Sequence, residues 1–275
     1  MADGDDQTFE VALAYDGAFV PRYAWRFGER LLGALRLGSR PSVLDLACRT
    51  GYPSSGVMER ARDGRVIALD RDAKFLELAR SRMGADVGRR VFLKQGGATE
   101  LRFGAEVFSH VICNLLDRVS VDRAAVLSEA RRVLIPGGQM VFTAALQGSF
   151  IEVVDMLREV ATRRDLARLA ERVEQYASAF PTTNQLRDEM VSQGFASVTV
   201  EAWEFTLDYP DAQALFADPV AQHAGISDWR WCAEAAPDAD AVLAAVRAAF
   251  DTYFRGVGFS ITIVGGVVSG YKPEG

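Results

Sequence analysis

Two aspartates, Asp45 within one apolar segment and Asp70 directly after another, are the residues most suited to ligand chemistry. The two apolar segments span residues 43–47 and 65–69, and a loop and a helical pattern separate them. This order predicts a βαβ unit, whose strands lie parallel and bind ligands at their carboxyl ends. An acidic residue that closes the second strand can accept hydrogen bonds from both hydroxyls of a ribose. The stretch therefore indicates a site for a nucleoside-containing ligand.

The loop between these segments carries a further pattern. Residues 45–51 read Asp-Leu-Ala-Cys-Arg-Thr-Gly, and Pro53 follows at a position that suits the start of a helix. The stretch resembles the first two motifs of class I S-adenosylmethionine-dependent methyltransferases, in which (D/E)-x-G-x-G-x-G follows strand one and an acid ends strand two. Ala47 and Arg49 replace the first two glycines of that pattern, and Gly51 keeps the third. The resemblance implies contacts to the cofactor S-adenosylmethionine from Asp45, Ala47, Cys48, Arg49, Gly51, Asp70, Arg71, Gly97, Ala98 and Asn114.

Arg49 has three interpretations that the sequence leaves open. Its guanidinium pairs with the carboxylate of the cofactor, or fills the cofactor space by pairing with Asp45 or Asp70, or points to solvent. Cys48 is either a thiol activated near a helix start or, more simply, a small residue in a tight loop. Asp45 either orients loop amides or meets the ammonium group of the cofactor, or it is a structural residue that only fixes the loop. Asp70 is either the ribose ligand or a surface residue that caps the next helix.

Three later segments extend the resemblance. The family has an aspartate that accepts from the adenine amino group where this chain has Gly97, which leaves only the amide of Ala98 for the ring. Ser109 stands where many members have aspartate, and Asn114 closes the fourth expected strand, facing the amino-acid part of the cofactor. Residues 131–143, RRVLIPGGQMVFT, match a fold signature of the family and predict a type II turn at the Pro-Gly-Gly.

Methyl transfer from a sulfonium is an in-line displacement, so positioning and exclusion of water are the main tasks of such an enzyme. A base is required only where the acceptor must lose a proton. His223 is the one histidine placed where a base could stand, although a plain surface histidine is the simpler interpretation; His110 is expected to be a core residue. Tyr15 and Tyr23 are further weak catalytic candidates. They match the aromatic part of the N-terminal cover that the family places over its cofactor, or they only pack a helix on the sheet.

Hydrophobic patterns define the elements that hold these residues. A helix is expected over residues 19–37, with Pro21 in its first turn and Trp25, Leu32 and Leu35 facing inward, while residues 1–10 are expected to be mobile. Further helices are expected to start at Pro53 and to span residues 72–83, 121–134, 182–193 and 240–254, with two more within 149–179. Strands are expected at residues 43–47, 65–69, 90–94, 108–114, 139–144, 196–208 and 259–272.

The resemblance implies a Rossmann-like α/β fold with a doubly wound, seven-stranded, mostly parallel sheet of order 3-2-1-4-5-7-6, strand 7 antiparallel, and a helical lid. Residues 1–41 form the N-terminal helical cover in this interpretation, residues 42–148 the cofactor-binding core, and residues 149–275 a helical insertion, strands six and seven and the lid. Trp229 and Trp231 in the lid line an apolar substrate pocket or pack a small subdomain.

The composition narrows the class of protein. The chain has 275 residues, 49% of them hydrophobic, and a net charge of −6, without a basic tract that would follow nucleic acid. Its three cysteines are far apart and no metal-ligand spacing is present, so we expect a reducing, cytoplasmic location and no metal. No apolar run approaches the roughly 20 residues that span a bilayer, so no membrane association is expected. The sequence leaves open whether the chain forms a homodimer.

Two functions follow from this pattern. The first is a methyltransferase that transfers a methyl group from S-adenosylmethionine to a small-molecule acceptor. The alternative is a pseudoenzyme, a catalytically inactive relative that binds a protein partner as a scaffold or regulator. Ala47, Arg49, Gly97 and Ser109 together favour the alternative, while Asp70 and Gly51 favour the first. A fold by itself does not decide between them.

Overall fold

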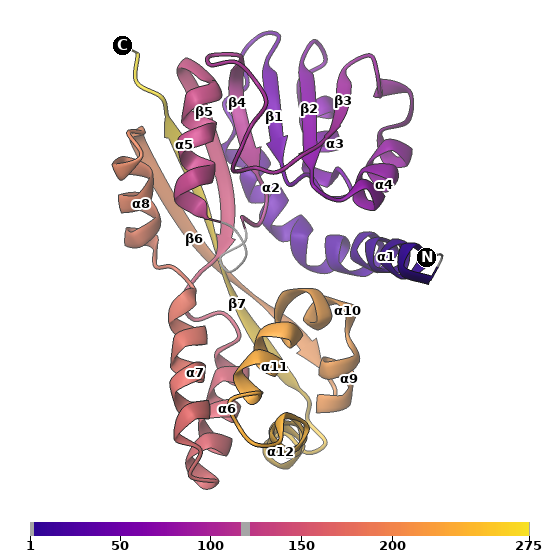
Figure 1. Cartoon of the computed structure of the whole chain (residues 1–275), viewed down its shortest axis with the longest axis vertical. Helices are drawn as coiled ribbons and strands as arrows, with labels where there is room; N and C mark the ends of the chain where they lie inside the picture. The colour runs from indigo at the N-terminus through magenta and orange to yellow at the C-terminus, as the bar shows by residue number, and fades with distance from the viewer. Residues whose placement is uncertain (1–2, 117–121, 275) are drawn as a thin grey trace. The chain divides into compact units, whose positions relative to one another are not determined.

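The computed structural model describes residues 3–116 and 122–274 and contains one seven-stranded sheet of order β3-β2-β1-β4-β5-β7-β6 (Figure 1). This order confirms the expected topology. β1 through β5 pair in parallel in the registers that βαβ units give, and β7 runs antiparallel to β5, since Gly137 bonds to Lys272 and Leu146 to Val264. The strands are β1 (Ser42–Leu46), β2 (Arg65–Asp70), β3 (Val91–Gln95), β4 (Phe108–Cys113), β5 (Leu134–Ala145), β6 (Ala196–Tyr209) and β7 (Phe259–Tyr271).

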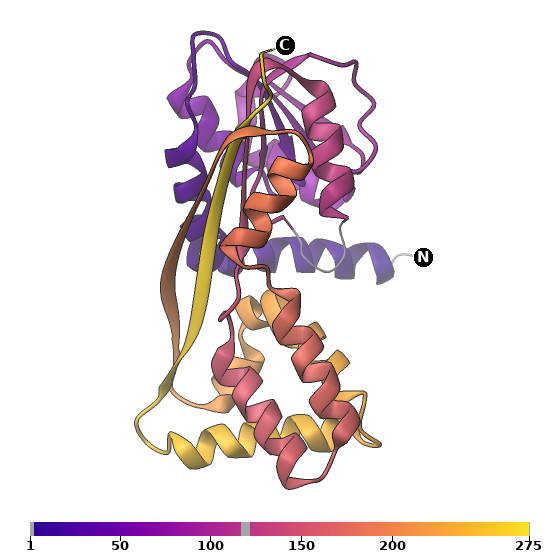
Figure 2. The same cartoon turned by 90° about the vertical axis from the view of Figure 1, so that its left-hand side faces the viewer.

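The chain divides into two compact units. The first comprises residues 1–144, 183–202 and 266–275, and it contains β1 to β4 with the helices that flank them. The second comprises residues 145–182 and 203–265. β6 and β7 each have residues in both units, and Figure 2 shows them as two long neighbouring strands. Within the described residues, no helix has both the length and the apolar character required to cross a bilayer.

The N-terminal region differs from the expected single helix. α1 (Asp3–Ala14) already begins in the segment expected to be mobile, and a π-helix, η1 (Tyr15–Ala24), leads into α2 (Trp25–Ala34). Pro21 lies inside η1 rather than in a first turn, and the wider π turn accommodates a residue that lacks a backbone N–H. Leu32 and Leu35 are buried, as expected, but Trp25 is 45% exposed, contrary to expectation, and Phe27 and Leu31 are buried as well.

The helices of the βαβ units begin where the sequence places them. α3 (Tyr52–Arg60) carries Pro53 in its first turn, and α4 (Ala73–Met83) is capped by Asp72, whose carboxylate accepts from the N–H of Lys74. α5 (Arg123–Val133) is capped by Asp122 in the same way; the first two residues expected in it fall partly outside the described ranges. Each of these helices begins after the carboxyl end of a strand, the edge of the sheet where the site residues lie.

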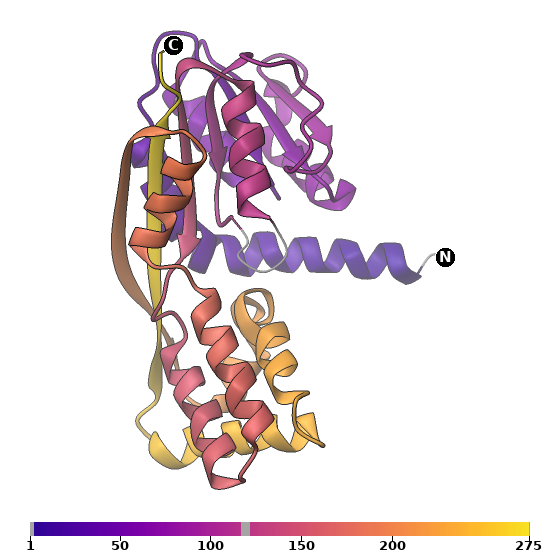
Figure 3. The ribbon, with the colours of Figure 1, turned by 60° about the vertical axis from the view of Figure 1, so that its left-hand side comes forward.

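The Pro-Gly-Gly segment forms a bulge rather than a free turn. Residues 136–138 lie within β5, and the pairing with β4 shifts there from Phe108–Leu134 to His110–Gln139. Gly137 has the positive φ (76°) that the expected turn required. α8 (Thr183–Ser192) lies against β7 (Figure 3), where a side chain at Gly270 would meet Met190 at 2.7 Å.

The second unit is mainly helical. α6 (Ile151–Arg163) and α7 (Ala167–Ala179) form the two helical patterns expected there, and α12 (Ala239–Tyr253) is the third expected helix. Four shorter helices were not expected: α9 (Ala212–Ala217), α10 (Pro219–Ala221), η3 (Gln222–Ile226) and α11 (Ser227–Ala233). Trp229 is fully buried and donates from its indole nitrogen to the hydroxyl of Tyr176 (3.0 Å), so it is a core residue of this unit. Trp231 is 41% exposed beside the guanidinium of Arg172, so the two tryptophans do not line one pocket.

Candidate functional site

The loop after β1 has the backbone of a glycine-rich loop, although two of the three glycines are replaced. Ala47 (φ 52°), Arg49 (φ 51°) and Gly51 (φ 78°) all have left-handed backbone conformations, a region that glycine occupies far more readily than other residues. The N–H of Cys48 donates to the carbonyl of Leu69 (3.0 Å), and the N–H of Gly51 donates to the carbonyl of Cys48 (2.8 Å). These bonds tie the loop to β2 and hold its conformation.

Gly51 is the position where a side chain is sterically excluded. A Cβ atom there would lie 2.3 Å from the Cε atom of Met83 and 3.2 Å from Cβ of Ala79, both on α4. The loop and α4 approach each other closely at this point. A side chain at Gly51 would therefore require the end of Met83 to move, in addition to a left-handed backbone.

Asp70 ends β2 and lies directly beside the loop. Its Oδ2 atom accepts from the N–H of Arg49 and its Oδ1 atom from the N–H of Asp72, both at 2.9 Å. The alternative of a surface helix cap is wrong, because Asp72 caps α4 and Asp70 is only 1% exposed. Each carboxylate oxygen retains a lone pair for a hydroxyl donor, which keeps the ribose interpretation chemically open.

Asp45 lies deeper in the same unit. It is fully buried, and its Oδ2 atom accepts from the hydroxyl of Ser54 on the first turn of α3 (2.6 Å). Burial raises the pKa of this carboxyl to about 7; the Ser54 hydrogen bond opposes the rise, and the charge of Asp70 adds to it. Among the described residues, neither Oδ1 of Asp45 nor the buried hydroxyl of Thr50 has a hydrogen-bond partner. Sequence reasoning missed Ser54 and Thr50, since their types are common at helix starts.

The Arg49 side chain lies against aromatic rings. Its guanidinium carbon is 5.1 Å from the ring centre of Phe75 on α4 and 6.0 Å from that of Tyr15 on η1, and the two rings meet edge to face at 5.2 Å. No ion pair with Asp45 or Asp70 occurs among the described residues, and the side chain is half-buried rather than extended into solvent. None of the three interpretations of Arg49 anticipated Phe75 as its neighbour.

The two N-terminal tyrosines have different surroundings. Tyr15 is at the site: burial raises the pKa of its hydroxyl, Arg49 opposes the rise, and the charges of Asp70 and Asp45 add to it. Tyr23 is buried between the rings of Phe19 and Phe27, which is the packing interpretation. Cys48 is also buried, and burial raises the pKa of its thiol well above the usual value, which argues against an activated thiolate.

Asn114 follows the carboxyl end of β4, as expected. Its Oδ1 atom accepts from the hydroxyl of Thr143 (2.8 Å), and its amide donates to the carbonyl of Ala24 at the end of η1 (3.1 Å). These bonds fix the amide and attach the N-terminal segment to the sheet. Gly97 is exposed with no atom within 4 Å of a built Cβ, and Ala98 beside it is half-buried; Arg71 is exposed.

Ser109 and His110 lie in β4, at the amino edge of the sheet, and His223 belongs to the second unit. Ser109 is the second residue of β4, and its hydroxyl bonds both backbone groups of Ser42 at the amino end of β1, the opposite edge of the sheet. His110 is buried between the Ser109 hydroxyl (2.8 Å) and the carbonyl of Arg36 (3.2 Å), and burial lowers its pKa, as expected of a core histidine. His223 belongs to η3 in the second unit.

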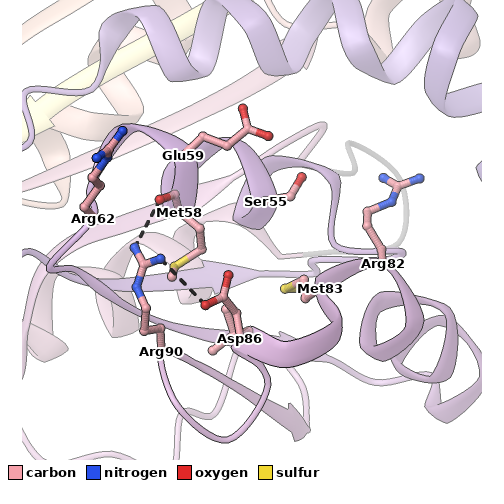
Figure 4. A pocket seen from close by; sticks show the side chains of 9 residues that line it. Ser55, Met58, Glu59, Arg62, Arg82, Met83, Asp86 and Arg90 are labelled. Atoms are coloured by element: carbon pink, nitrogen blue, oxygen red, sulfur yellow. Dashed lines mark hydrogen bonds and ion pairs between the residues drawn. The ribbon is translucent and has the colours of Figure 1, made fainter.

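A separate groove of about 640 Å³ lies between α3, α4 and the start of β3 (Figure 4). Met58 and Met83 line it, and Arg62, Arg82 and Arg90 stand around it with their charged ends apart. Arg90 uses its guanidinium on the carbonyls of Met58 (3.1 Å) and Ala61 (2.6 Å), which end α3. Arg90 also forms an ion pair with Asp86 (3.7 Å), so its guanidinium is already engaged within the groove (Figure 4).

Comparisons with known proteins identify the family of the chain. A family model described as a methyltransferase domain matches residues 43–138. The malonyl-[acyl-carrier protein] O-methyltransferase of Methylococcus capsulatus is 31% identical over 76% of this chain and 71% of its own length. The corresponding protein of Erwinia pyrifoliae is 31% identical over 67% of this chain and 62% of its own length. The chain belongs to the class I S-adenosylmethionine-dependent methyltransferase family.

Two further relatives bear on substrate and fold. The demethylmenaquinone methyltransferase of Lactiplantibacillus plantarum is 35% identical, over 42% of this chain and 49% of its own length. A putative methyltransferase from Bacillus halodurans has the same fold, with a TM-score of 0.60 at 19% identity over 90% of this chain and 98% of that one. The matched regions thus span about half to two thirds of several relatives, and the activity of the whole protein does not follow from them.

The residues present fit the cofactor of this family in part. The left-handed loop, the Asp70 carboxylate and the unpartnered Oδ1 atom of Asp45 suit a ligand with hydroxyl and ammonium donors. The low exposure of Asp70 and the position of the Arg49 side chain do not suit it as they stand. The site therefore combines a loop and carboxylates that suit such a ligand with a buried Asp70 and an Arg49 side chain that do not.

Proposed function

We propose that the protein is an S-adenosylmethionine-dependent methyltransferase acting on a small-molecule acceptor. One observation supports this above the others: residues 47, 49 and 51 keep the left-handed conformations of a glycine-rich loop, with Asp70 hydrogen-bonded to that loop. The N–H of Arg49 donates to Asp70, so the loop conformation and the proposed ribose ligand are directly linked. Family membership gives the proposal its cofactor.

Each residue of the site has a role that this function requires. S-adenosylmethionine supplies a methyl group that its sulfonium already activates. Asp70 holds the ribose hydroxyls, and the loop amides and Asn114 hold the amino-acid end. Asp45, with a pKa near 7, retains a proton over part of the neutral range, so its unpartnered Oδ1 either donates or accepts according to pH.

The named relatives indicate the chemical class of the methyl acceptor but not which compound it is. The named relatives act on a malonyl group of an acyl-carrier protein and on demethylmenaquinone, both acceptors whose reacting atom is carried on a small organic group. The described residues offer His223 and Tyr15 as the weak candidates for a base. Tyr15 is unsuited to losing a proton at neutral pH, because burial raises its pKa. Tyr15 is therefore not expected to act as a base toward the acceptor.

The test is calorimetric titration of the purified full chain with S-adenosylmethionine and S-adenosylhomocysteine, followed by transfer of a labelled methyl group to carboxylate and quinol acceptors. Micromolar binding of both nucleosides, with adenosine alone binding more weakly, is the expected result. A folded protein that binds neither at millimolar concentration would reject the proposal. That outcome would favour the inactive scaffold, for which the low exposure of Asp70 is the specific observation.

A further inference from the structure

The ribose-binding carboxylate of the proposed site is not accessible in this structure. Asp70 is 1% exposed although it ends a strand at the ligand-binding edge of the sheet. The Arg49 backbone bonds directly to it, and its charge acts on the Tyr15 hydroxyl. A ribose cannot reach Asp70 until the groups that cover it move. This inference rests on the proposed function and concerns how the cofactor enters.

Three side chains near this carboxylate contact one another, and we name them the Tyr15–Arg49–Phe75 stack. The guanidinium of Arg49 faces both rings, at 5.1 Å from Phe75 and 6.0 Å from Tyr15, and the rings contact each other at 5.2 Å. A guanidinium on ring faces is attracted modestly at exposed sites and more strongly where water is excluded. The two contacts therefore hold the Arg49 side chain in place with modest strength.

The stack joins the N-terminal segment to the cofactor loop. Tyr15 belongs to η1, Arg49 to the loop and Phe75 to α4. The neighbouring residue Asp16 forms an ion pair with Arg82 on α4, which holds η1 in the same place. The family pattern has glycine at position 49, so the guanidinium is an addition of this chain. The loop backbone is already in the glycine conformation and needs no rearrangement when the side chain moves.

We propose that the Tyr15–Arg49–Phe75 stack occupies the ribose position, that the cofactor binds by displacing the Arg49 side chain, and that Arg49 is the residue that sets cofactor affinity. Arg49→Gly then removes the displaced group without disturbing the backbone. Tyr15→Leu removes one ring face and weakens the same stack. Because both changes act on one contact, their effects on affinity are less than additive.

The experiment measures the affinity of the full chain for S-adenosylhomocysteine, which cannot react. Arg49→Gly is expected to bind about tenfold more tightly than the unchanged protein. Arg49→Asn tolerates the left-handed backbone without glycine's flexibility and is expected to behave in the same way. Arg40→Gly is the matched control: Arg40 is exposed, has φ 54°, and lies at the amino end of β1, so it undergoes the same change of charge and backbone away from the site.

The outcomes separate this inference from the proposed function. Tighter binding by both Arg49 variants than by the unchanged protein, with unchanged binding by Arg40→Gly, supports the displacement of Arg49. Binding by the Arg49 variants alone overturns it, because the unchanged protein would then be blocked rather than opened by the cofactor. Weaker binding by Arg49→Gly overturns it and shows that Arg49 contacts the cofactor. Equal binding by all variants overturns it as well. Absence of binding by every variant, each shown to be folded by circular dichroism, rejects the proposed function itself.

Discussion

Replacing Asp45 with Asn should remove a pH dependence that one buried carboxyl imposes on stability. Burial raises the pKa of Asp45 from 3.8 to about 7 in the folded protein. Between these values the folded state holds a proton that the unfolded state has lost, so stability falls as pH rises. The contribution is fully present below about pH 4 and is lost by about pH 7. At 1.36 kcal/mol per pKa unit the whole shift corresponds to about 4 kcal/mol, of which about 2.5 kcal/mol falls between pH 5 and pH 8.

The assay is urea unfolding of the unchanged protein and of Asp45→Asn at pH 5, 6, 7 and 8. Asn mimics the protonated carboxyl: its oxygen can accept from Ser54, and its amide replaces the unpartnered oxygen. The difference in unfolding free energy between the two proteins removes the contribution of all other titrating groups. That difference should change in favour of the variant by about 2.5 kcal/mol from pH 5 to pH 8. A flat difference, or one of opposite slope, would show that Asp45 is ionised in the folded protein.

Two other substitutions test the loop and the adenine position. Ala47→Gly should raise the unfolding free energy, measured by urea denaturation, by about 0.5–1 kcal/mol. Glycine removes the strain of a left-handed alanine at φ 52° in the folded state, and this gain exceeds the cost of the greater flexibility that glycine gives the unfolded chain. A loss of stability would contradict the presence of strain at Ala47. Gly97→Asp places an acceptor where no atom lies within 4 Å of a built Cβ, so S-adenosylhomocysteine should bind about three- to tenfold more tightly. Gly97→Ala is its control and should not change the affinity; equal affinities for both variants would place the adenine elsewhere.

The sequence predicted the sheet and the positions of the two aspartates because both depend on local patterns. Apolar runs of strand length and an aspartate after the second run are visible without any contact information, and the fold order followed from the family resemblance. The position of the Arg49 side chain was not predictable in this way, because its neighbours Tyr15 and Phe75 come from elements 34 and 26 residues away. Side-chain placement of this kind depends on tertiary packing.

The expectation for the N-terminus was partly correct. Leu32 and Leu35 are buried, as the helical spacing predicted, together with Phe27 and Leu31. Trp25, at the junction of η1 and α2, is exposed, and the π-helical form of η1 with Pro21 inside it was not visible in the spacing. The short helices α9 to α11 were missed because three to seven residues are too few to show a period.

The four substitutions that favoured an inactive relative do not have equal weight once they are placed in the fold. Ser109 joins β4 to β1 at the edge opposite the site, so it has no bearing on the cofactor. Ala47 and Arg49 keep the backbone of the glycines they replace, since hydrogen bonds to Leu69 and Asp70 hold the loop. What remains is one side chain, that of Arg49, and one missing acceptor at Gly97. Both are changes of side chain on an intact backbone, so single substitutions can reverse them, and the choice between enzyme and scaffold becomes a question of measured affinity.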